Sequence, residues 1–255
     1  MPVPDSYTIL ITGAGSGLGH GLSLYFAANG HRVLAADKCA ESVKATAAEA
    51  GANVSAFELD VSSHAQIAAF GDSLDDRHVD VLINNAGLQH VAQLEEFPTE
   101  KWDQLIDVML KGSAAMTRLV LPGMRQNNFG RIVNIGSIHS LVASPFKTAY
   151  TAAKTGLLGL SRVVALETAD VDITINTVCP AYIRTPLVEK QIHDQALEHG
   201  IPEADVVEKI MLEPMPKKAF ITIEEVAAAI EYLISPAARN MTGQSLVLDG
   251  GWTCR

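Results

Sequence analysis

The sequence has few of the features that mark disulfide-rich, membrane or nucleic-acid-binding proteins. Its three cysteines, Cys39, Cys179 and Cys254, lie far apart and form no C-x-x-C pair, so neither a disulfide framework nor a thiolate metal site is predicted. No apolar run approaches the ~20 residues of a membrane span. No cluster of Lys and Arg offsets the net charge of -10, which argues against a nucleic-acid partner.

Two further signals are missing. The first six residues have neither the basic region nor the apolar segment of a secretory signal peptide, and we therefore expect a cytoplasmic protein. His193 and His199 are six residues apart with no H-E-x-x-H pattern, so no metal site is predicted. Gly136–Ser140 lacks the second glycine of a G-x-S-x-G nucleophile elbow.

Short, nearly continuous apolar runs alternate with segments of helical length. Strands are predicted at residues 7–12, 32–37, 53–60, 79–84, 130–135, 172–178 and 244–248, and helices include 18–29, 96–112 and 149–169. This alternation predicts an α/β fold with a parallel sheet covered on both faces. No linker or repeat divides the chain, so residues 1–255 are predicted to form one domain. The long charged insertion 186–220 is predicted to be a helical substrate lid.

The first predicted strand runs into a glycine-rich turn, Thr12-Gly13-Ala14-Gly15-Ser16-Gly17-Leu18-Gly19. Such a turn brings backbone N–H groups and a helix N-terminus close to a pyrophosphate, although it can also be a plain strand–helix connector. Asp37, at the end of the second strand, is placed to bind an adenosine ribose and to repel a 2′-phosphate, which favours NAD. The alternatives are that Asp37 only caps a helix, and that Lys38 admits NADP.

Several motifs occur together in one order and spacing: Thr12-Gly13-x-x-x-Gly17-x-Gly19, Asn84-Asn85-Ala86-Gly87, Ser137, Tyr150-x-x-x-Lys154 and Asp249-Gly250-Gly251. They resemble the signature set of the short-chain dehydrogenase/reductase family. The resemblance implies a doubly wound, Rossmann-type sheet of seven parallel strands and a homotetramer. It also implies NAD-binding residues, which are Gly13, Ser16, Gly17, Leu18, Gly19, Asp37, Asp60, Val61, Asn84, Ala86, Gly87, Tyr150, Lys154, Pro180, Ile183 and Thr185.

The predicted catalytic residues are Ser137, Tyr150 and Lys154. Tyr150 and Lys154 are four residues apart on a predicted helix, so their side chains point the same way. A nearby ammonium favours the phenolate and is expected to lower the pKa of Tyr150, which ordinarily lies near 10. Tyr150 would then take the hydroxyl proton as hydride leaves the same carbon. Ser137 would hydrogen-bond the substrate oxygen, and Lys154 would also hold the nicotinamide ribose.

The chain departs from the family pattern at two positions. Met109, within Val108-Met109-Leu110-Lys111-Gly112, occupies the place where the family usually has an asparagine that anchors a proton relay. Ala181 follows Pro180 where glycine is usual. We expect the relay to be altered and the tyrosine chemistry to be retained.

Residues around the predicted catalytic centre indicate the substrate. Gln89, His139, Lys147 and Gln191 offer two possible cations and two amides, which suits a carboxylate. The surrounding sequence resembles the family members that oxidise D-3-hydroxybutyrate to acetoacetate, which implies that these four side chains bind the carboxylate. The resemblance further implies that Tyr182 and Trp252 wall the methyl pocket.

Two other functions compete with this interpretation. A 3-oxoacyl thioester reductase would share the fold and the catalytic residues, but Asp37 argues against the NADP that such enzymes usually prefer. A non-catalytic dinucleotide-sensing protein is the second alternative. Met109 is the one feature in its favour, whereas the intact Ser137, Tyr150 and Lys154 argue against it.

Overall fold

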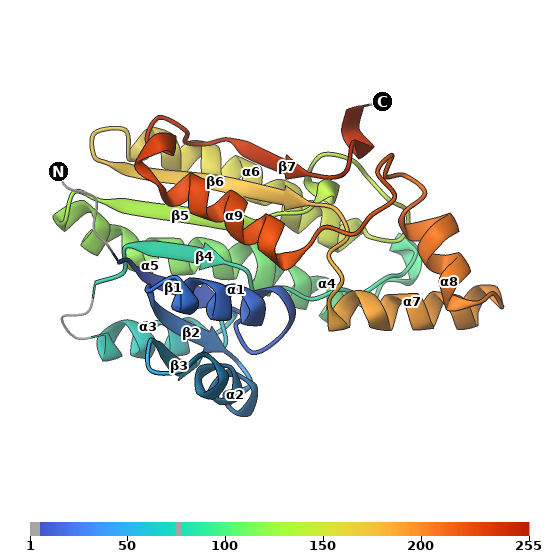
Figure 1. Cartoon of the computed structure of the whole chain (residues 1–255), viewed down its shortest axis with the longest axis horizontal. Coiled ribbons are helices and arrows are strands. Elements are labelled where there is room, and N and C mark those ends of the chain that lie inside the picture. Colours follow the sequence, from blue (N-terminus) through green and yellow to red (C-terminus); the bar gives the residue numbers. More distant parts are fainter. Residues whose placement is uncertain (1–5, 75–77, 255) are drawn as a thin grey trace.

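A sheet of seven parallel strands forms the centre of the molecule (Figure 1). The computed structural model describes residues 6–74 and 78–254, so the two ends of the predicted single domain lie outside the described residues. The strands are β1 Thr8–Thr12, β2 Arg32–Asp37, β3 Val54–Glu58, β4 Val81–Asn84, β5 Gly130–Ile135, β6 Ile173–Pro180 and β7 Ser245–Leu248. Their order, β3-β2-β1-β4-β5-β6-β7, confirms the predicted doubly wound sheet.

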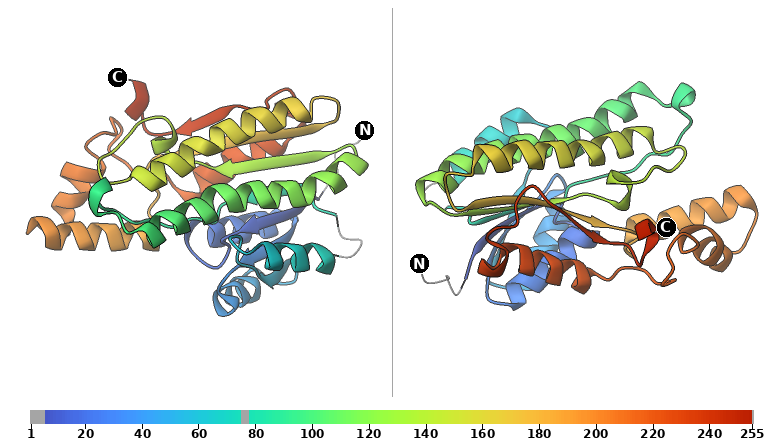
Figure 2. Two further views of the ribbon diagram at one scale, coloured as in Figure 1. Left: turned by 180° about the vertical axis from the view of Figure 1, so that it is seen from behind. Right: turned by 90° about the horizontal axis from the view of Figure 1, so that it is seen from above.

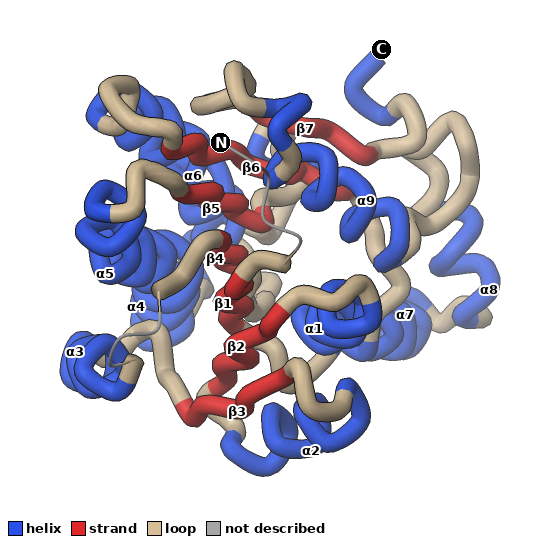
Figure 3. The backbone as a smooth tube through the Cα atoms, turned by 60° about the vertical axis from the view of Figure 1, so that its left-hand side comes forward, coloured by secondary structure: helices blue, strands red, loops and turns tan. Residues whose placement is uncertain are grey.

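Helices cover both faces of the sheet (Figures 2 and 3). One layer contains α1 Gly17–Ala28, α2 Ala40–Ala50 and α9 Ile223–Ile234, and the other contains α3 His64–Ser73, α4 Thr99–Ile106, α5 Ser113–Gln126 and α6 Thr148–Glu167. None of the helices in the described part of the chain has both the length and the apolar character needed to cross a bilayer.

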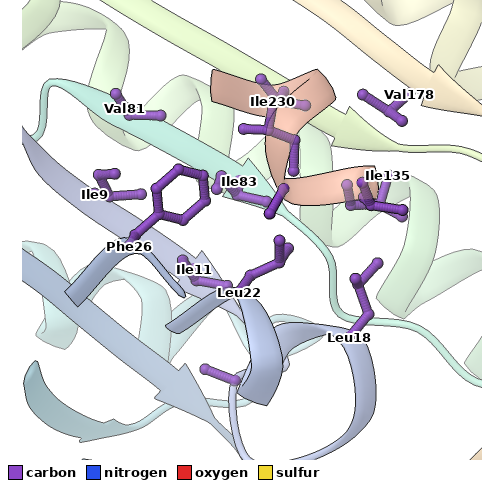
Figure 4. Packing of buried hydrophobic residues seen from close by; sticks show 14 of the residues in the cluster. Ile9, Ile11, Leu18, Leu22, Phe26, Val81, Ile83, Ile135, Val178 and Ile230 are labelled. Atoms are coloured by element: carbon purple, nitrogen blue, oxygen red, sulfur yellow. The ribbon is translucent and has the colours of Figure 1, made fainter. Parts of the chain in front are cut away.

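Alternate residues of each strand pack against opposite helix layers. Ile9 and Ile11 of β1 belong to the cluster beneath α1 and α9, whereas Leu10 lies in the cluster on the other face. Figure 4 shows the first cluster, in which Phe26 of α1 lies against Ile9 and Ile83. Both faces are therefore buried, which explains why the strands read as continuous apolar runs rather than as alternating patterns.

The helix predicted at residues 96–112 differs from the observed structure. The α-helix α4 ends at Ile106, and a π-helical segment, Asp107–Gly112, leads directly into α5. The hydroxyl of Ser113 donates to the carbonyl of Met109 over 2.8 Å. Gly112 lies against Val61, and a Cβ on Gly112 would be 2.9 Å from the Val61 carbonyl oxygen. The π-helical segment thus places Gly112 against Val61 and Met109 against Ala149 and Ala153 of α6.

Residues 186–220 contain α7 Pro186–His199, α8 Glu203–Val206 and a π-helical segment, Val207–Met211. These helices extend from one end of the molecule (Figure 1). Their apolar side chains form a small separate cluster, which consists of Val188, Ile192, Val206 and Met211. The insertion is helical, as predicted.

Candidate active site

A cavity of about 500 Å³ opens at the carboxyl ends of the strands. It lies beside β1 and β4, where the strand order reverses and where doubly wound folds bind their ligands. Many of the predicted site residues line it: Gly13, Ser16, Gly17, Leu18, Asp37, Gly87, Gln89, Ser137, His139, Lys147, Tyr150, Lys154, Pro180, Tyr182, Ile183, Thr185 and Gln191. The predicted residues outside this lining are Gly19, Asp60, Val61, Asn84, Ala86 and Trp252.

The glycine-rich turn forms one end of the cavity. Gly13 and Gly17 have φ values of +67° and +53°, which disfavour any residue with a Cβ. A Cβ on Gly17 would lie 3.6 Å from that of Thr185 and would fill part of the cavity between them. The turn therefore leaves room for a ligand at the N-terminus of α1, as a bound pyrophosphate requires.

Asn85 anchors this turn, although it was not among the predicted site residues. Its Nδ2 donates to the carbonyls of Thr12 and Gly13 over 2.9 and 3.2 Å. In return, the Thr12 hydroxyl accepts the N–H groups of Asn85 and Ala86. The Asn84-Asn85-Ala86-Gly87 motif was the available signal, but the sequence did not tell which asparagine faces the turn.

Asp37 joins the end of β2 to the glycine-rich turn. One carboxylate oxygen accepts the N–H of Gly15 at 2.9 Å, and the other accepts the N–H of Cys39 at the same distance. The N-cap of α2 is Cys39 rather than Asp37. Both oxygens keep a free lone pair for ribose hydroxyls, and the carboxylate faces the cavity together with Lys38.

Three predicted cofactor residues have structural contacts instead. Asp60 accepts the N–H of Ser62 at 2.9 Å and closes the turn before α3. Val61 packs against Gly112. Asn84 is buried and donates to Asn134 Oδ1 over 2.8 Å. Their roles in cofactor binding stay predictions.

Ser137 follows β5 and begins a one-turn 3₁₀ helix, Ile138–Ser140. Its hydroxyl accepts the N–H of His139 at 3.1 Å, while its own N–H donates to the Ser140 hydroxyl at 3.2 Å. The Ser140 hydroxyl donates to the Lys154 carbonyl over 3.0 Å. This capping box fixes the end of β5 against α6, which carries Tyr150 and Lys154.

Tyr150 and Lys154 face the cavity from α6. Lys154 Nζ lies 5.7 Å from the centre of the Tyr150 ring and donates to the Ile135 carbonyl over 2.6 Å. Burial lowers the pKa of Lys154 to about 8. Burial also raises the pKa of Tyr150, and a hydrogen bond with Ser137 opposes that rise. The pKa of Tyr150 is therefore not lowered as expected, because desolvation of the phenolate is the largest influence on it.

Lys147 and His139 meet deep in the opposite end of the cavity. Both are buried, and Lys147 Nζ lies 3.2 Å from His139 Nε2 and 5.5 Å from the centre of the Tyr182 ring. Burial and then the neighbouring Lys147 ammonium lower the pKa of His139 to about 4. Burial lowers the pKa of Lys147 as well. His139 is therefore neutral near neutral pH, and only one of the two expected cations is present.

Aromatic rings enclose this end of the cavity. The His139 ring meets those of Tyr150 and Trp252 edge-on, at centroid distances of 6.3 and 5.8 Å, and Trp252 packs against Tyr182 at 6.0 Å. Asp249 orders the turn before Trp252 by accepting N–H groups of Gly251 and Thr253. Trp252 thus supports the wall from behind.

The two amides approach from different elements. Gln89 lies in the loop after β4, where its Oε1 accepts the N–H of His90 at 3.2 Å, and Gln191 lies on α7. Leu88 and Val188 add apolar lining that no sequence motif indicated. Both glutamines thus line the same cavity as Lys147.

Met109 lies behind the catalytic helix. Its side chain is buried and belongs to a cluster with Leu105, Ala149 and Ala153, which Tyr150 also contacts. An apolar side chain therefore fills the place of the family asparagine, and the Met109 carbonyl is bonded to Ser113.

Comparisons with known proteins agree with this geometry. The family model described as short chain dehydrogenase matches residues 7–196. The chain is 42% identical to a D-beta-hydroxybutyrate dehydrogenase of Rhizobium meliloti (97% of this chain, 99% of the relative), and 41% identical to one of Cupriavidus necator (97% and 98%). A 3-oxoacyl-(acyl-carrier-protein) reductase of Thermotoga maritima is 35% identical (95% and 96%). The fold, the cavity and these matches together establish that the chain belongs to the short-chain dehydrogenase family of oxidoreductases.

Proposed function

We propose that this enzyme oxidises a small 3-hydroxy acid with NAD, and that D-3-hydroxybutyrate, giving acetoacetate, is its best substrate. The observation that carries the proposal is the Lys147 ammonium, which is only 8% exposed and faces the cavity. Among the side chains that the structure describes, no carboxylate lies within ion-pair distance of it. A buried charge without an opposite charge beside it is costly, so a substrate anion would complement Lys147.

The size of the substrate supports the same conclusion. A C4 hydroxy acid buries little apolar surface, and each CH₂ contributes roughly 0.8 kcal/mol. Its carboxylate must therefore supply much of the orientation, through charge-assisted hydrogen bonds. Lys147 would provide the charge, Gln89 and Gln191 would add direction, and Tyr182, backed by Trp252, would enclose the methyl group. The two hydroxybutyrate dehydrogenases among the relatives support this assignment.

NAD is the proposed cofactor because Asp37 presents a fixed carboxylate at the end of β2. The carboxylate can accept both ribose hydroxyls, and its charge opposes a 2′-phosphate. When bound, the nicotinamide accepts or returns the hydride. Gly13 and Gly17 would admit the pyrophosphate, while Pro180, Ile183 and Thr185 would hold the nicotinamide end.

The chain's own groups would move the proton. Ser137 holds the substrate oxygen beside the Tyr150 hydroxyl, and Tyr150 takes the proton of the alcohol during oxidation. The Lys154 ammonium, held by the Ile135 carbonyl, stabilises the phenolate that precedes this transfer. Because burial alone raises the pKa of Tyr150, positive charge close to the phenol is needed for activity near neutral pH.

The direct test is NADH formation, followed at 340 nm, with D-3-hydroxybutyrate, its methyl ester and 2-butanol. We expect the acid to be oxidised with far higher kcat/KM than either neutral compound. Equal rates for acid and ester would contradict the proposal. They would favour the alternative of a 3-oxoacyl thioester reductase, which the Thermotoga maritima relative and the position of Lys38 beside Asp37 support.

We also propose a homotetramer. Val163 and Leu166 on the outer face of α6 are 55% and 80% exposed, which suits a contact between subunits. Light scattering after size exclusion tests this, and a monomer at assay concentration would contradict it. The cytoplasmic location stays a prediction.

A further inference from the structure

His139 contacts both functional ends of the site. Its backbone N–H donates to the Ser137 hydroxyl over 3.1 Å. Its ring Nδ1 lies 3.3 Å from the Val142 carbonyl oxygen, and its Nε2 lies 3.2 Å from Lys147 Nζ. The side chain is 3% exposed. One residue thus links the catalytic serine to the buried ammonium.

The two ring contacts require one tautomer. A carbonyl oxygen can only accept a hydrogen bond, so Nδ1 must carry the proton. An ammonium can only donate, so Nε2 must offer its lone pair. A neutral imidazole protonated on Nδ1 satisfies both contacts. The other tautomer satisfies neither contact, and the imidazolium satisfies only the contact with the Val142 carbonyl.

We infer that His139 is a positioning residue, whose Nε2 lone pair holds the Lys147 ammonium in place to receive the substrate carboxylate. The inference rests on the proposed function, because it takes the carboxylate as the ligand of Lys147. It assigns His139 a different role from the one implied by the family resemblance, in which this ring itself binds the anion. Here the ring binds the cation that binds the anion.

The backbone before Lys147 supports this role. Phe146 has a φ of +66°, an uncommon conformation for a bulky residue, and its carbonyl accepts the N–H of Ala92 at 3.1 Å. The loop after β4 therefore fixes the main chain of Lys147, and His139 fixes the far end of its side chain. Lysine loses up to about 2 kcal/mol of side-chain entropy when ordered, so prior ordering reduces the cost of binding the substrate.

A double-mutant cycle tests this inference. His139→Asn keeps a donor near the Val142 carbonyl but is too short to reach Lys147, whereas His139→Gln can place an amide oxygen near the Nε2 position. We expect His139→Asn to raise KM for D-3-hydroxybutyrate about tenfold, or about 1.4 kcal/mol, with a much smaller change in kcat. His139→Gln should recover most of this loss.

The decisive comparison is made in the Lys147→Ala background. If His139 acts through Lys147, His139→Asn should cause no further rise in KM there, since the contact is already lost. An equal rise in both backgrounds would show that His139 binds the substrate directly and would overturn the inference. The control is His78→Asn, at the opposite end of the sheet, where His78 pairs with Asp80.

A second measurement does not depend on the substrate. ¹⁵N NMR of histidine-labelled protein, with His139→Asn used for assignment, should show His139 as the neutral tautomer protonated on Nδ1. In Lys147→Ala, this preference should weaken. A wild-type His139 protonated on Nε2 would overturn the inference. By contrast, equal turnover of acid and ester by the wild type would refute the proposed substrate class and leave the tautomer result to stand by itself.

Discussion

Gly19 of α1 packs against the backbone of the glycine-rich turn more closely than any Cβ permits. A Cβ on Gly19 would lie 2.2 Å from the Gly13 carbonyl oxygen and 2.5 Å from Asn85 Nδ2. The first neighbour is main chain at a residue with positive φ, so it cannot rotate away as a side chain could. Gly19→Ala should therefore displace the turn that receives the cofactor.

The size of the effect follows from two opposing contributions. Alanine in a helix is favoured over glycine by up to about 1 kcal/mol, whereas overpacking typically costs about 1–3 kcal/mol. We expect Gly19→Ala to lose about 1–2 kcal/mol of stability, which lowers Tm by several degrees at about 2–4 °C per kcal/mol for a protein of this size. NAD affinity should fall as well.

The matched control is Gly159→Ala on α6, where a Cβ would meet nothing within 4 Å. This variant should melt at or slightly above the wild-type temperature and bind NAD normally. Differential scanning calorimetry and NAD titration measure both quantities. A Gly19→Ala protein with wild-type Tm and wild-type NAD affinity would refute the close-approach argument.

Other changes probe the cofactor, the proton path and the charge. Asp37→Ser should lower kcat/KM for NAD about tenfold or more, since a hydrogen bond to a charged group contributes about 1.5–3 kcal/mol, and should improve use of NADP. Tyr150→Phe should abolish turnover, because no other phenol occupies its place beside Ser137; appreciable activity would be incompatible with the mechanism. Met109→Asn should not raise kcat, and it should lower Tm because it buries an amide in an apolar cluster; a faster enzyme would contradict this expectation. Because burial lowers the pKa of Lys147, the ammonium is lost as pH rises through that lowered value. Lys154 affects the acid and the methyl ester alike, so the ratio of their kcat/KM values cancels its effect. This ratio should therefore fall at a pH below the usual lysine range, and a constant ratio up to pH 10 would exclude the role assigned to Lys147.

Features set by local pattern were predictable from the sequence. The seven strands lie within two residues of their expected bounds, because most of them are buried apolar runs closed by a turn residue. The glycine-rich turn and the Tyr150–Lys154 pair on α6 also follow from spacing alone. These features depend on neighbours in the chain, and the sequence records those neighbours directly.

Features set by long-range burial were not predictable. The π-helical turn at Asp107–Gly112 has no sequence signature that separates it from α4. The neutrality of His139 arises from burial beside Lys147, and the inward orientation of Asn84 arises from its contact with Asn134 on β5. Each depends on residues brought together by the fold, so residue type and spacing could suggest a role but not a charge state or a direction.

The proposed function depends on the Lys147 ammonium, which would bind the carboxylate of the substrate. The most direct measurement compares kcat/KM for D-3-hydroxybutyrate and for its methyl ester in the wild type and in Lys147→Ala. Lys209→Ala on the exposed surface, where Lys209 pairs with Asp205, serves as the control. We predict that Lys147→Ala lowers kcat/KM for the acid at least about tenfold, or about 1.4 kcal/mol of transition-state stabilisation, and leaves the ester nearly unchanged. An equal loss for acid and ester, or no loss for either, would contradict the claim.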